Sequence, residues 1–315
     1  MIIVDFTKEH IPQAVSLILS NYAEELSQMP YLPPVGDLPD LEKFTNNEFG
    51  VTAIEGSEIL GFLCFYPIRN NAFTTYSKGT FSPLHGHGAV FENRSIIYKR
   101  MYQAAAAKLV TAGASSHSIS LFANDEQAIN AFFTYGFGLR CIDAVRPLTP
   151  IDAVCSCGLD MRLVSKEDLS LIRPLRRMLT DHLSQSPCFM YLSDKEFNAW
   201  LELAEKRESL IFAAFDSDNA VAFIEISKSG ENFLTCAGDM QNICGAFCLP
   251  SYRGKRVFQC LLNFVISKLT SEGYKRVGVD FESFNPTAMH FWPKYFTPYT
   301  KSVVRRIDEK VFSKV

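Results

Sequence analysis

Four residues at the start of a predicted helix have the composition of an anion site. Arg253, Gly254, Lys255 and Arg256 form a turn between an apolar segment, residues 243–249, and an amphipathic stretch. Such a turn directs free backbone N–H groups and the positive end of the helix dipole at one spot, where three cations add their charge. The cations repel one another unless an anion offsets them, so we predict that this turn binds an anion. The alternative is a solvated helix end with exposed cations.

Four acidic residues of the same half of the chain are candidates for proton transfer, namely Glu225, Asp239, Asp280 and Glu282. Asp280 and Glu282 alternate with apolar residues, so on a strand their side chains point to the same face. If they are buried together, their repulsion raises the pKa of one of them; if both face solvent, no such shift arises. The sequence alone leaves both arrangements open.

The elements that position these residues follow from the apolar pattern. Residues 243–249 form an apolar run that is closed by Pro250 and is too short for a typical helix, so we predict a strand. After the turn, apolar and polar residues separate onto two faces at helical spacing, which predicts a helix. Its apolar face comprises Val257, Leu261, Leu262, Phe264, Val265 and Leu269.

The composition limits the class of protein. The chain has 315 residues, of which 47% are hydrophobic and 21% charged, as in a globular protein of two domains. The formal net charge of −3 argues against a general basic field for nucleic acid or an anionic membrane. No apolar run reaches the ~18 residues of a membrane span. Nine scattered cysteines and an N-terminus without a leader-like pattern predict a reduced, cytoplasmic protein.

Two residue pairs have a weak similarity to metal sites. His85 and His87 lie in the sequence His-Gly-His-Gly, and Cys155 and Cys157 are separated by one residue. Neither pair has a further partner nearby at a spacing typical of metal ligands. We therefore expect polar loops with free thiols and imidazoles, and no bound metal.

The order of predicted elements occurs twice along the chain. Each half begins with a strand and an amphipathic helix, continues with a hairpin, and returns to alternating strands and helices. The final helices of the halves can be aligned, because Asp125-x-x-Ala128 in the first matches Asn285-x-x-Ala288 in the second. We interpret the chain as two copies of one fold.

Both copies resemble the GNAT superfamily of N-acetyltransferases, and the C-terminal copy is the closer one. In the family, the pyrophosphate turn has the sequence Arg/Gln-x-x-Gly-x-Gly/Ala and follows a strand that ends in Val-x-Pro-x-Tyr. The corresponding sequence in this chain is Cys-Leu-Pro-Ser-Tyr-Arg-Gly-Lys-Arg-Val-Phe. Both final helices are similar to the family's Asn-x-x-Ala-x-x-Leu-Tyr-x-x-x-Gly-Phe. The resemblance covers nearly the whole chain and implies an α/β (α+β) fold of two tandem domains, each with a mixed, mostly antiparallel splayed sheet flanked by helices.

The resemblance also implies different roles for the two domains. Residues 1–148 would be a degenerate GNAT-like domain, because no basic turn precedes its long helix. Residues 155–315 would hold acetyl-CoA, which is a co-substrate in this family. The strand before the turn and Asn285 would contact the pantetheine arm, and the turn would hold the pyrophosphate. The implied cofactor-binding residues are Ala246, Phe247, Cys248, Arg253, Gly254, Lys255, Arg256, Val257, Phe258 and Asn285.

In many family members a tyrosine of the last helix protonates the departing thiolate. This chain has Trp292 at that position, and an indole cannot act as the acid. Tyr295 lies nearly one turn further on, so we take it as the candidate acid, with a packed core position as the alternative. Asp280 and Glu282 are the candidate bases for the amine proton. An alternative is that Cys248 acts as a nucleophile, but an apolar strand raises the pKa of a thiol.

Two positions of the turn depart from the family pattern and leave the function open. Arg256 stands where the family has glycine, and Phe258 where it has glycine or alanine; both side chains limit the approach of phosphates to the backbone. The leading hypothesis is direct transfer of an acetyl group to a small-molecule or peptide amine. The alternatives are a catalytically inactive module that binds CoA or another ligand, and a structural protein without a ligand. We expect a monomer or homodimer, with neither nucleic acid nor membrane as partner.

Overall fold

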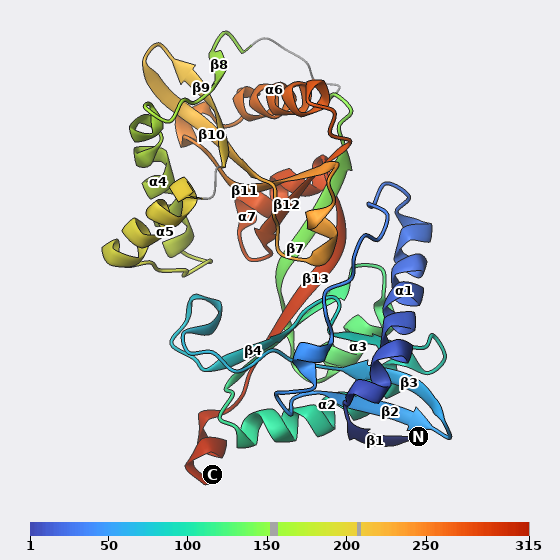
Figure 1. Ribbon diagram of the computed structural model, residues 1–315. Coiled ribbons are helices and arrows are strands. Elements are labelled where there is room, and N and C mark those ends of the chain that lie inside the picture. Colours follow the sequence, from blue (N-terminus) through green and yellow to red (C-terminus); the bar gives the residue numbers. More distant parts are fainter. Residues whose placement is uncertain (152–156, 207–208, 315) are drawn as a thin grey trace. The chain divides into compact units, whose positions relative to one another are not determined.

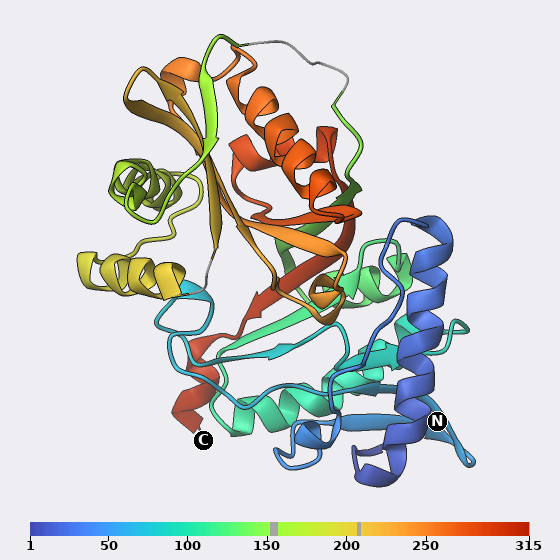
Figure 2. The same cartoon turned by 45° about the horizontal axis from the view of Figure 1, so that its top comes forward.

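The computed structural model describes residues 1–151, 157–206 and 209–314 and divides into two compact units (Figures 1 and 2). Unit 1 comprises Met1–Ile142 and Pro298–Val315, and unit 2 comprises Asp143–Thr297. These limits differ from the predicted 1–148 and 155–315, because the end of the chain completes unit 1 while the residues after Ile142 enter unit 2. Cys155, at the predicted start of the second domain, lies outside the described residues.

Unit 1 contains a four-stranded antiparallel sheet with a helix on each face. Helix α1 (Ile11–Gln28) packs Leu17 and Ile18 near Phe62, and helix α2 (Arg94–Thr111) packs Ile97 and Met101 near Leu63. Neighbouring residues of a strand point to opposite faces, which is why Phe62 and Leu63 meet different helices. In sheet order the strands are β1 (Ile2–Asp5), β2 (Val51–Glu55), β3 (Glu58–Leu63) and β5 (His87–Ala89).

A second group of strands in unit 1 contains its parallel pair. Strand β4 (Gly79–Ser82) runs parallel to β6 (Ser116–Phe122), and β13 (Thr297–Arg306) pairs antiparallel with the other edge of β6. Helix α3 (Glu126–Thr134) follows β6 and leads into β7 (Gly138–Pro147). The C-terminal strand therefore occupies the place in unit 1 that a continuous domain would fill with its own last strand.

Unit 2 contains one mixed sheet in the order β7, β12, β11, β10, β9, β8. Its strands include β8 (Asp160–Leu163), β9 (Leu210–Asp216), β10 (Asn219–Ser227), β11 (Met240–Cys248) and β12 (Arg276–Glu282). Strands β8 to β11 are antiparallel neighbours, and β11 runs parallel to β12. Each unit thus contains a parallel pair beside antiparallel neighbours, which confirms the predicted mixed, mostly antiparallel sheets.

Helices cover both faces of the unit 2 sheet (Figure 1). Helix α4 (Arg173–Ser184) packs Leu175 against Ala213 and Phe215 of β9, whereas α6 (Val257–Ser271) places Phe264 against Phe212. The predicted apolar face of α6 is confirmed, since most of it is buried. The remaining helices are α5 (Asp194–Lys206) and the short α7 (Pro286–Phe291).

Two irregularities in the unit 2 sheet create an opening. The ladder between β11 and β12 ends at the pair Ile243 and Val279, so the following residues of the two strands diverge. Beside it, Glu225 pairs with Gly245 while the next residue of β10 pairs with Ile243, which leaves Cys244 as an extra residue. A bulge of this kind bends the strand and redirects its side chains.

None of the helices in the described residues is long and apolar enough to cross a membrane.

Candidate active site

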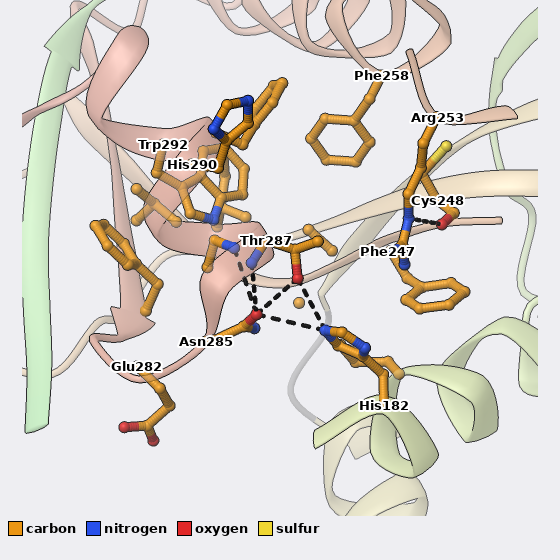
Figure 3. Close-up of a pocket in the computed structure, with 18 of the residues that line it drawn as sticks. His182, Phe247, Cys248, Arg253, Phe258, Glu282, Asn285, Thr287, His290 and Trp292 are labelled. Atoms are coloured by element: carbon orange, nitrogen blue, oxygen red, sulfur yellow. Dashed lines mark hydrogen bonds between the residues drawn. The ribbon is translucent and has the colours of Figure 1, made fainter. Parts of the chain in front are cut away.

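A pocket of about 550 Å³ occupies the gap where β11 and β12 diverge (Figure 3). Its walls come from these two strands, from the turn before α6 and the first turn of α6, and from α4 and α7. Such a volume is typical of small-molecule and cofactor sites.

The pocket brings together most of the site residues predicted from the sequence. Its lining includes every predicted cofactor-binding residue except Lys255, and both candidate bases. These residues are Ala246, Phe247, Cys248, Arg253, Gly254, Arg256, Val257, Phe258, Asn285, Asp280 and Glu282. Tyr295 does not line the pocket.

Tyr295 is displaced because the last helix does not continue to it. Helix α7 ends at Phe291, and a 3-10 turn at Trp292–Lys294 follows, with Pro293 inside it. Tyr295 has φ −123°, which is not helical, so the expected shared helix face with Trp292 does not form. Its ring packs against Phe291 at 4.9 Å between ring centroids. Tyr295 therefore takes the packed position that was the alternative to its role as the acid.

The turn before α6 keeps an unusual backbone without the family glycine. Gly254 has φ +73°, and Arg256, the residue before the first helical residue, has φ +62°. A side chain in this left-handed region costs roughly 1–2 kcal/mol. The Arg253 Nε donates to the carbonyl oxygen of Cys248 at 3.0 Å, and its guanidinium lies over the Phe247 ring. Arg253 therefore fastens the turn to the end of β11 while remaining exposed.

Phe258 packs within an aromatic cluster at the pocket wall. Its ring makes edge contacts with Phe291 at 5.0 Å and with Trp292 at 5.8 Å between centroids. Edge-to-face contacts of this kind are worth about 0.5–1.5 kcal/mol each. The phenyl ring, where the family has a small residue, is therefore held against α7.

The four candidate carboxylates differ in their partners. Glu225 accepts a hydrogen bond from Arg176 at 2.8 Å, and both side chains are buried. Asp239 accepts from Arg276 at 2.6 Å at the opposite end of β11. Asp280 and Glu282 are the two that line the pocket.

Asp280 is a pocket carboxyl whose pKa is strongly perturbed. Its burial, and then the nearby carboxylates of Glu231, Asp143 and Glu282, raise its pKa well above the ordinary value. Both effects disfavour the charged form. The raised pKa favours the protonated form of Asp280, which is the direction expected for a carboxyl buried near other carboxyls.

The thiol of Cys248 is a poor nucleophile in this setting. Burial raises its pKa to about 11, and the neighbouring Arg253 lowers it only in part. The attacking species is the thiolate, so a thiol protonated at neutral pH argues against a covalent acetyl intermediate on Cys248.

His182 and Thr287 are pocket residues that the sequence analysis did not single out, and they meet at the start of α7. His182 of α4 places its Nε2 2.9 Å from the Thr287 Oγ1 and 3.4 Å from the Asn285 Oδ1 (Figure 3). Asn285 is the residue before α7, and its Oδ1 accepts from the backbone N–H groups of Thr287 and Ala288. The contact joins residues more than a hundred positions apart, so no local sequence pattern indicates it.

The predicted polar loop around His85 and His87 is wrong. Both imidazoles are buried in unit 1, and His87 begins β5. Burial lowers the pKa of His85 to about 3 and that of His87 to about 4. Among the described residues, no group of three potential metal ligands gathers; Cys155 lies outside that set.

Comparison with known proteins agrees with this fold. The model of the acetyltransferase (GNAT) family matches residues 176–296, which contain every wall of the pocket. No curated protein sequence matches the chain.

Solved structures match across nearly the full length at low identity. A GCN5-related N-acetyltransferase from Sphaerobacter thermophilus is 12% identical, with 97% of this chain and 95% of that chain covered and a TM-score of 0.59. A GNAT-family acetyltransferase from Colwellia psychrerythraea is 11% identical, with 98% and 100% covered and a TM-score of 0.51. A glucosamine N-acetyltransferase region of a fungal β-N-acetylglucosaminidase is 8% identical, with 96% and 38% covered and a TM-score of 0.55.

The GNAT family model thus matches the part of the chain that holds the pocket, and the whole chain has the fold of these GNAT structures.

Proposed function

We propose that unit 2 transfers an acetyl group from acetyl-CoA directly to an amine of a small molecule or peptide. The observation that carries this proposal is the pocket between the diverging strands, which joins a cationic helix start to a pair of carboxylates. Arg253 and Glu282 lie on opposite sides of it in Figure 3. One end thus suits phosphate, and the other suits an ammonium group.

The residues of unit 2 would divide the work as follows. Arg253 and Arg256 would donate charge-assisted hydrogen bonds to the pyrophosphate, in part replacing the backbone N–H groups that their side chains screen. The backbone of Ala246 and Phe247, which β12 no longer pairs, would hold the pantetheine arm. Glu282 would bind the ammonium form of the acceptor beside the Asp280 carboxyl, whose raised pKa favours its neutral form. The high pKa of the Cys248 thiol supports direct transfer over a two-step route.

A catalytically inactive, CoA-binding module is the second candidate. The observation that favours it is the aromatic cluster of Phe258, Phe291 and Trp292, which narrows the pocket and replaces the family's tyrosine acid with an indole. The two candidates predict the same binding and different turnover.

Titration calorimetry of the full chain with acetyl-CoA tests the shared part. We expect saturable binding, and Arg253→Ala should weaken it about 10-fold or more, since a hydrogen bond to a charged group is worth about 1.5–3 kcal/mol. Lys268→Ala, which removes an exposed cation at the far end of the same helix, is the matched control and should leave the affinity unchanged. Absence of saturable binding at millimolar acetyl-CoA would refute both candidates.

Acetyl-CoA consumption over a panel of amines, aminoglycosides and lysine peptides separates the two. The transferase predicts consumption with at least one acceptor, and binding without consumption favours the inactive module. Phe258→Gly should tighten binding or leave it unchanged, because it removes the ring that crowds the site. Tyr295→Phe should leave turnover unchanged, since that residue does not line the pocket; a 10²-fold loss would restore it as the acid.

A further inference from the structure

His182 lies beside the start of α7, where it contacts Thr287 and Asn285 (Figure 3). It lines the pocket from α4, and its ring is half-buried. Figure 3 shows it reaching from α4 toward Asn285 and Thr287, with the Phe247 ring at 6.4 Å between centroids. No role in the proposed function requires this imidazole, yet it is held by two polar contacts.

The hydrogen bonds around Thr287 determine which nitrogen of His182 carries a proton. The Asn285 Oδ1 accepts from two backbone N–H groups, so the oxygen rather than the amide nitrogen lies at this position. Thr287 Oγ1 is 2.7 Å from that oxygen and must donate its one proton to it. The same hydroxyl therefore accepts from His182, at 2.9 Å, and Nε2 is the protonated nitrogen.

This arrangement leaves the lone pair on His182 Nδ1. In the neutral imidazole one nitrogen donates and the other accepts, so a proton fixed on Nε2 makes Nδ1 the basic atom. No hydrogen bond from a described residue reaches Nδ1. A histidine whose tautomer is held by an ordered partner has the organisation of a general base.

Titratable and charged groups from several elements line the same pocket as the imidazole. They come from β12, from the turn before α6, from β11, and from α7 with the turn after it. These groups are Asp280, Glu282, Arg253, Arg256, Cys248, His290 and Lys294, all of which line the same pocket. Asp181, the neighbour of His182 on α4, is exposed and paired with Arg177.

We propose that His182 moves the proton in the acetyl transfer and that Thr287 positions it, a role that rests on the proposed function of unit 2. The acceptor, which binds as an ammonium ion, first releases one proton to solvent. His182 Nδ1 then takes a proton from the amine nitrogen while that nitrogen forms its bond to the thioester carbonyl carbon. The C–S bond then breaks, its electron pair goes to sulfur, and the imidazolium returns the proton to the thiolate. The products are the N-acetyl amine and the free thiol, and His182 ends in its original form. No tyrosine acid is needed.

Matched substitutions in the full chain test this role. His182→Gln retains an N–H donor for Thr287 but cannot accept a proton, and should lower kcat by about 10²-fold or more, the usual scale for one positioned base. It should also abolish the limb of the pH–rate profile that reports the imidazole, while acetyl-CoA affinity by calorimetry stays unchanged. His290→Gln removes a second pocket histidine, which lies beside Lys294, and should leave the profile intact. Acceptors are spermidine, 2-phenylethylamine, an aminoglycoside and a lysine peptide.

Nitrogen-15 NMR of the histidine rings gives a readout that needs no acceptor. We expect His182 in the Nε2–H tautomer, assigned through the signal that His182→Gln removes. Thr287→Val should weaken this preference, and Thr287→Ser, which keeps the hydroxyl, should preserve it. A dominant Nδ1–H tautomer would overturn the proposal.

The outcomes distinguish this inference from the function on which it rests. Wild-type turnover that survives His182→Gln with an unchanged pH profile overturns the role of His182 alone. A wild-type protein that binds acetyl-CoA and consumes none with any acceptor overturns the transfer and this role together.

Discussion

The two units enter their long helices with nearly the same backbone and use it differently. The residue before α2 in unit 1 is Asn93, with φ 56° and ψ 22°, and the residue before α6 in unit 2 is Arg256, with φ 62° and ψ 6°. In unit 1 the next residue, Arg94, is buried and pairs with Glu24 and Asp125. In unit 2 the next residue is Val257, and a pocket remains open beside it.

The gap between strands shows the same contrast. In unit 1 the His87 ring lies between β5 and β6, with one nitrogen 2.6 Å from the carbonyl oxygen of Ser120 and the other 2.8 Å from the Tyr98 hydroxyl. In unit 2 the corresponding gap between β11 and β12 is the 550 Å³ pocket. The comparison teaches that one fold can satisfy the polar groups of its splayed sheet with its own side chains, or leave them for a ligand.

The largest expected effect is a loss of stability when Arg94, the buried arginine at the start of α2, is replaced. The Arg94 side chain is 3% exposed, and it makes paired 2.8 Å contacts with both oxygens of Glu24. Arg94→Ala leaves Asp125 buried without its cation, so we expect a loss of about 2–3 kcal/mol, below the 3–5 kcal/mol of a fully buried pair because Glu24 is partly solvated. Urea unfolding measures it.

Lys8→Ala is the control for the Arg94 change, since it breaks an exposed pair with Glu42 and should cost less than about 1 kcal/mol. Arg94→Ala should not create a second acetyl-CoA site, because Glu24 and Asp125 would repel the phosphates. A loss as small as that of the control, or binding of two acetyl-CoA molecules per chain, would contradict the contrast between the units.

Local signals predicted the elements of both units, and long-range contacts limited the rest. The pattern from Val257 to Leu269 has a full helical face, and this expectation holds. The aligned residues Asp125 and Asn285 both accept hydrogen bonds at the start of a helix, as capping residues do. The exchange of last strands was not predictable, because an alternating strand pairs equally well with an edge from either half of the chain. His182 was missed for the same reason, since only the folded sheet brings it to Thr287.

A smaller effect should come from Glu25, a buried carboxyl of unit 1. Glu25 is 2% exposed, and burial raises its pKa to about 7 from the ordinary 4.5 despite two hydrogen bonds from Asn124. Between these values the folded state binds more protons than the unfolded one, so this group's contribution to stability falls as pH rises and is lost above about pH 7.

The glutamine of the Glu25→Gln variant cannot ionise, so the stability of this variant should not fall with rising pH as that of the wild type does. Relative to the wild type, the variant should gain about 1–3 kcal/mol in the free energy of unfolding between pH 4.5 and pH 8, since one pKa unit corresponds to about 1.4 kcal/mol. Glu126→Gln, at an exposed position of α3, should show little change over this range. Parallel pH dependence in the Glu25 variant and the wild type would show that the carboxyl stays charged in unit 1.

The smallest effect tests the shared backbone itself. A left-handed residue other than glycine costs roughly 1–2 kcal/mol, but asparagine tolerates this region, and glycine adds entropy to the unfolded chain. Arg256→Gly should therefore stabilise unit 2 by about 0.5–1 kcal/mol, whereas Asn93→Gly should change unit 1 by a few tenths of a kcal/mol at most. Urea unfolding of both variants without ligand measures the difference. Equal effects would mean that the two helix starts carry the same strain. A loss of stability in Arg256→Gly would mean that the contacts of the arginine outweigh its backbone cost. In that case the arginine, where the family has glycine, stabilises the free protein.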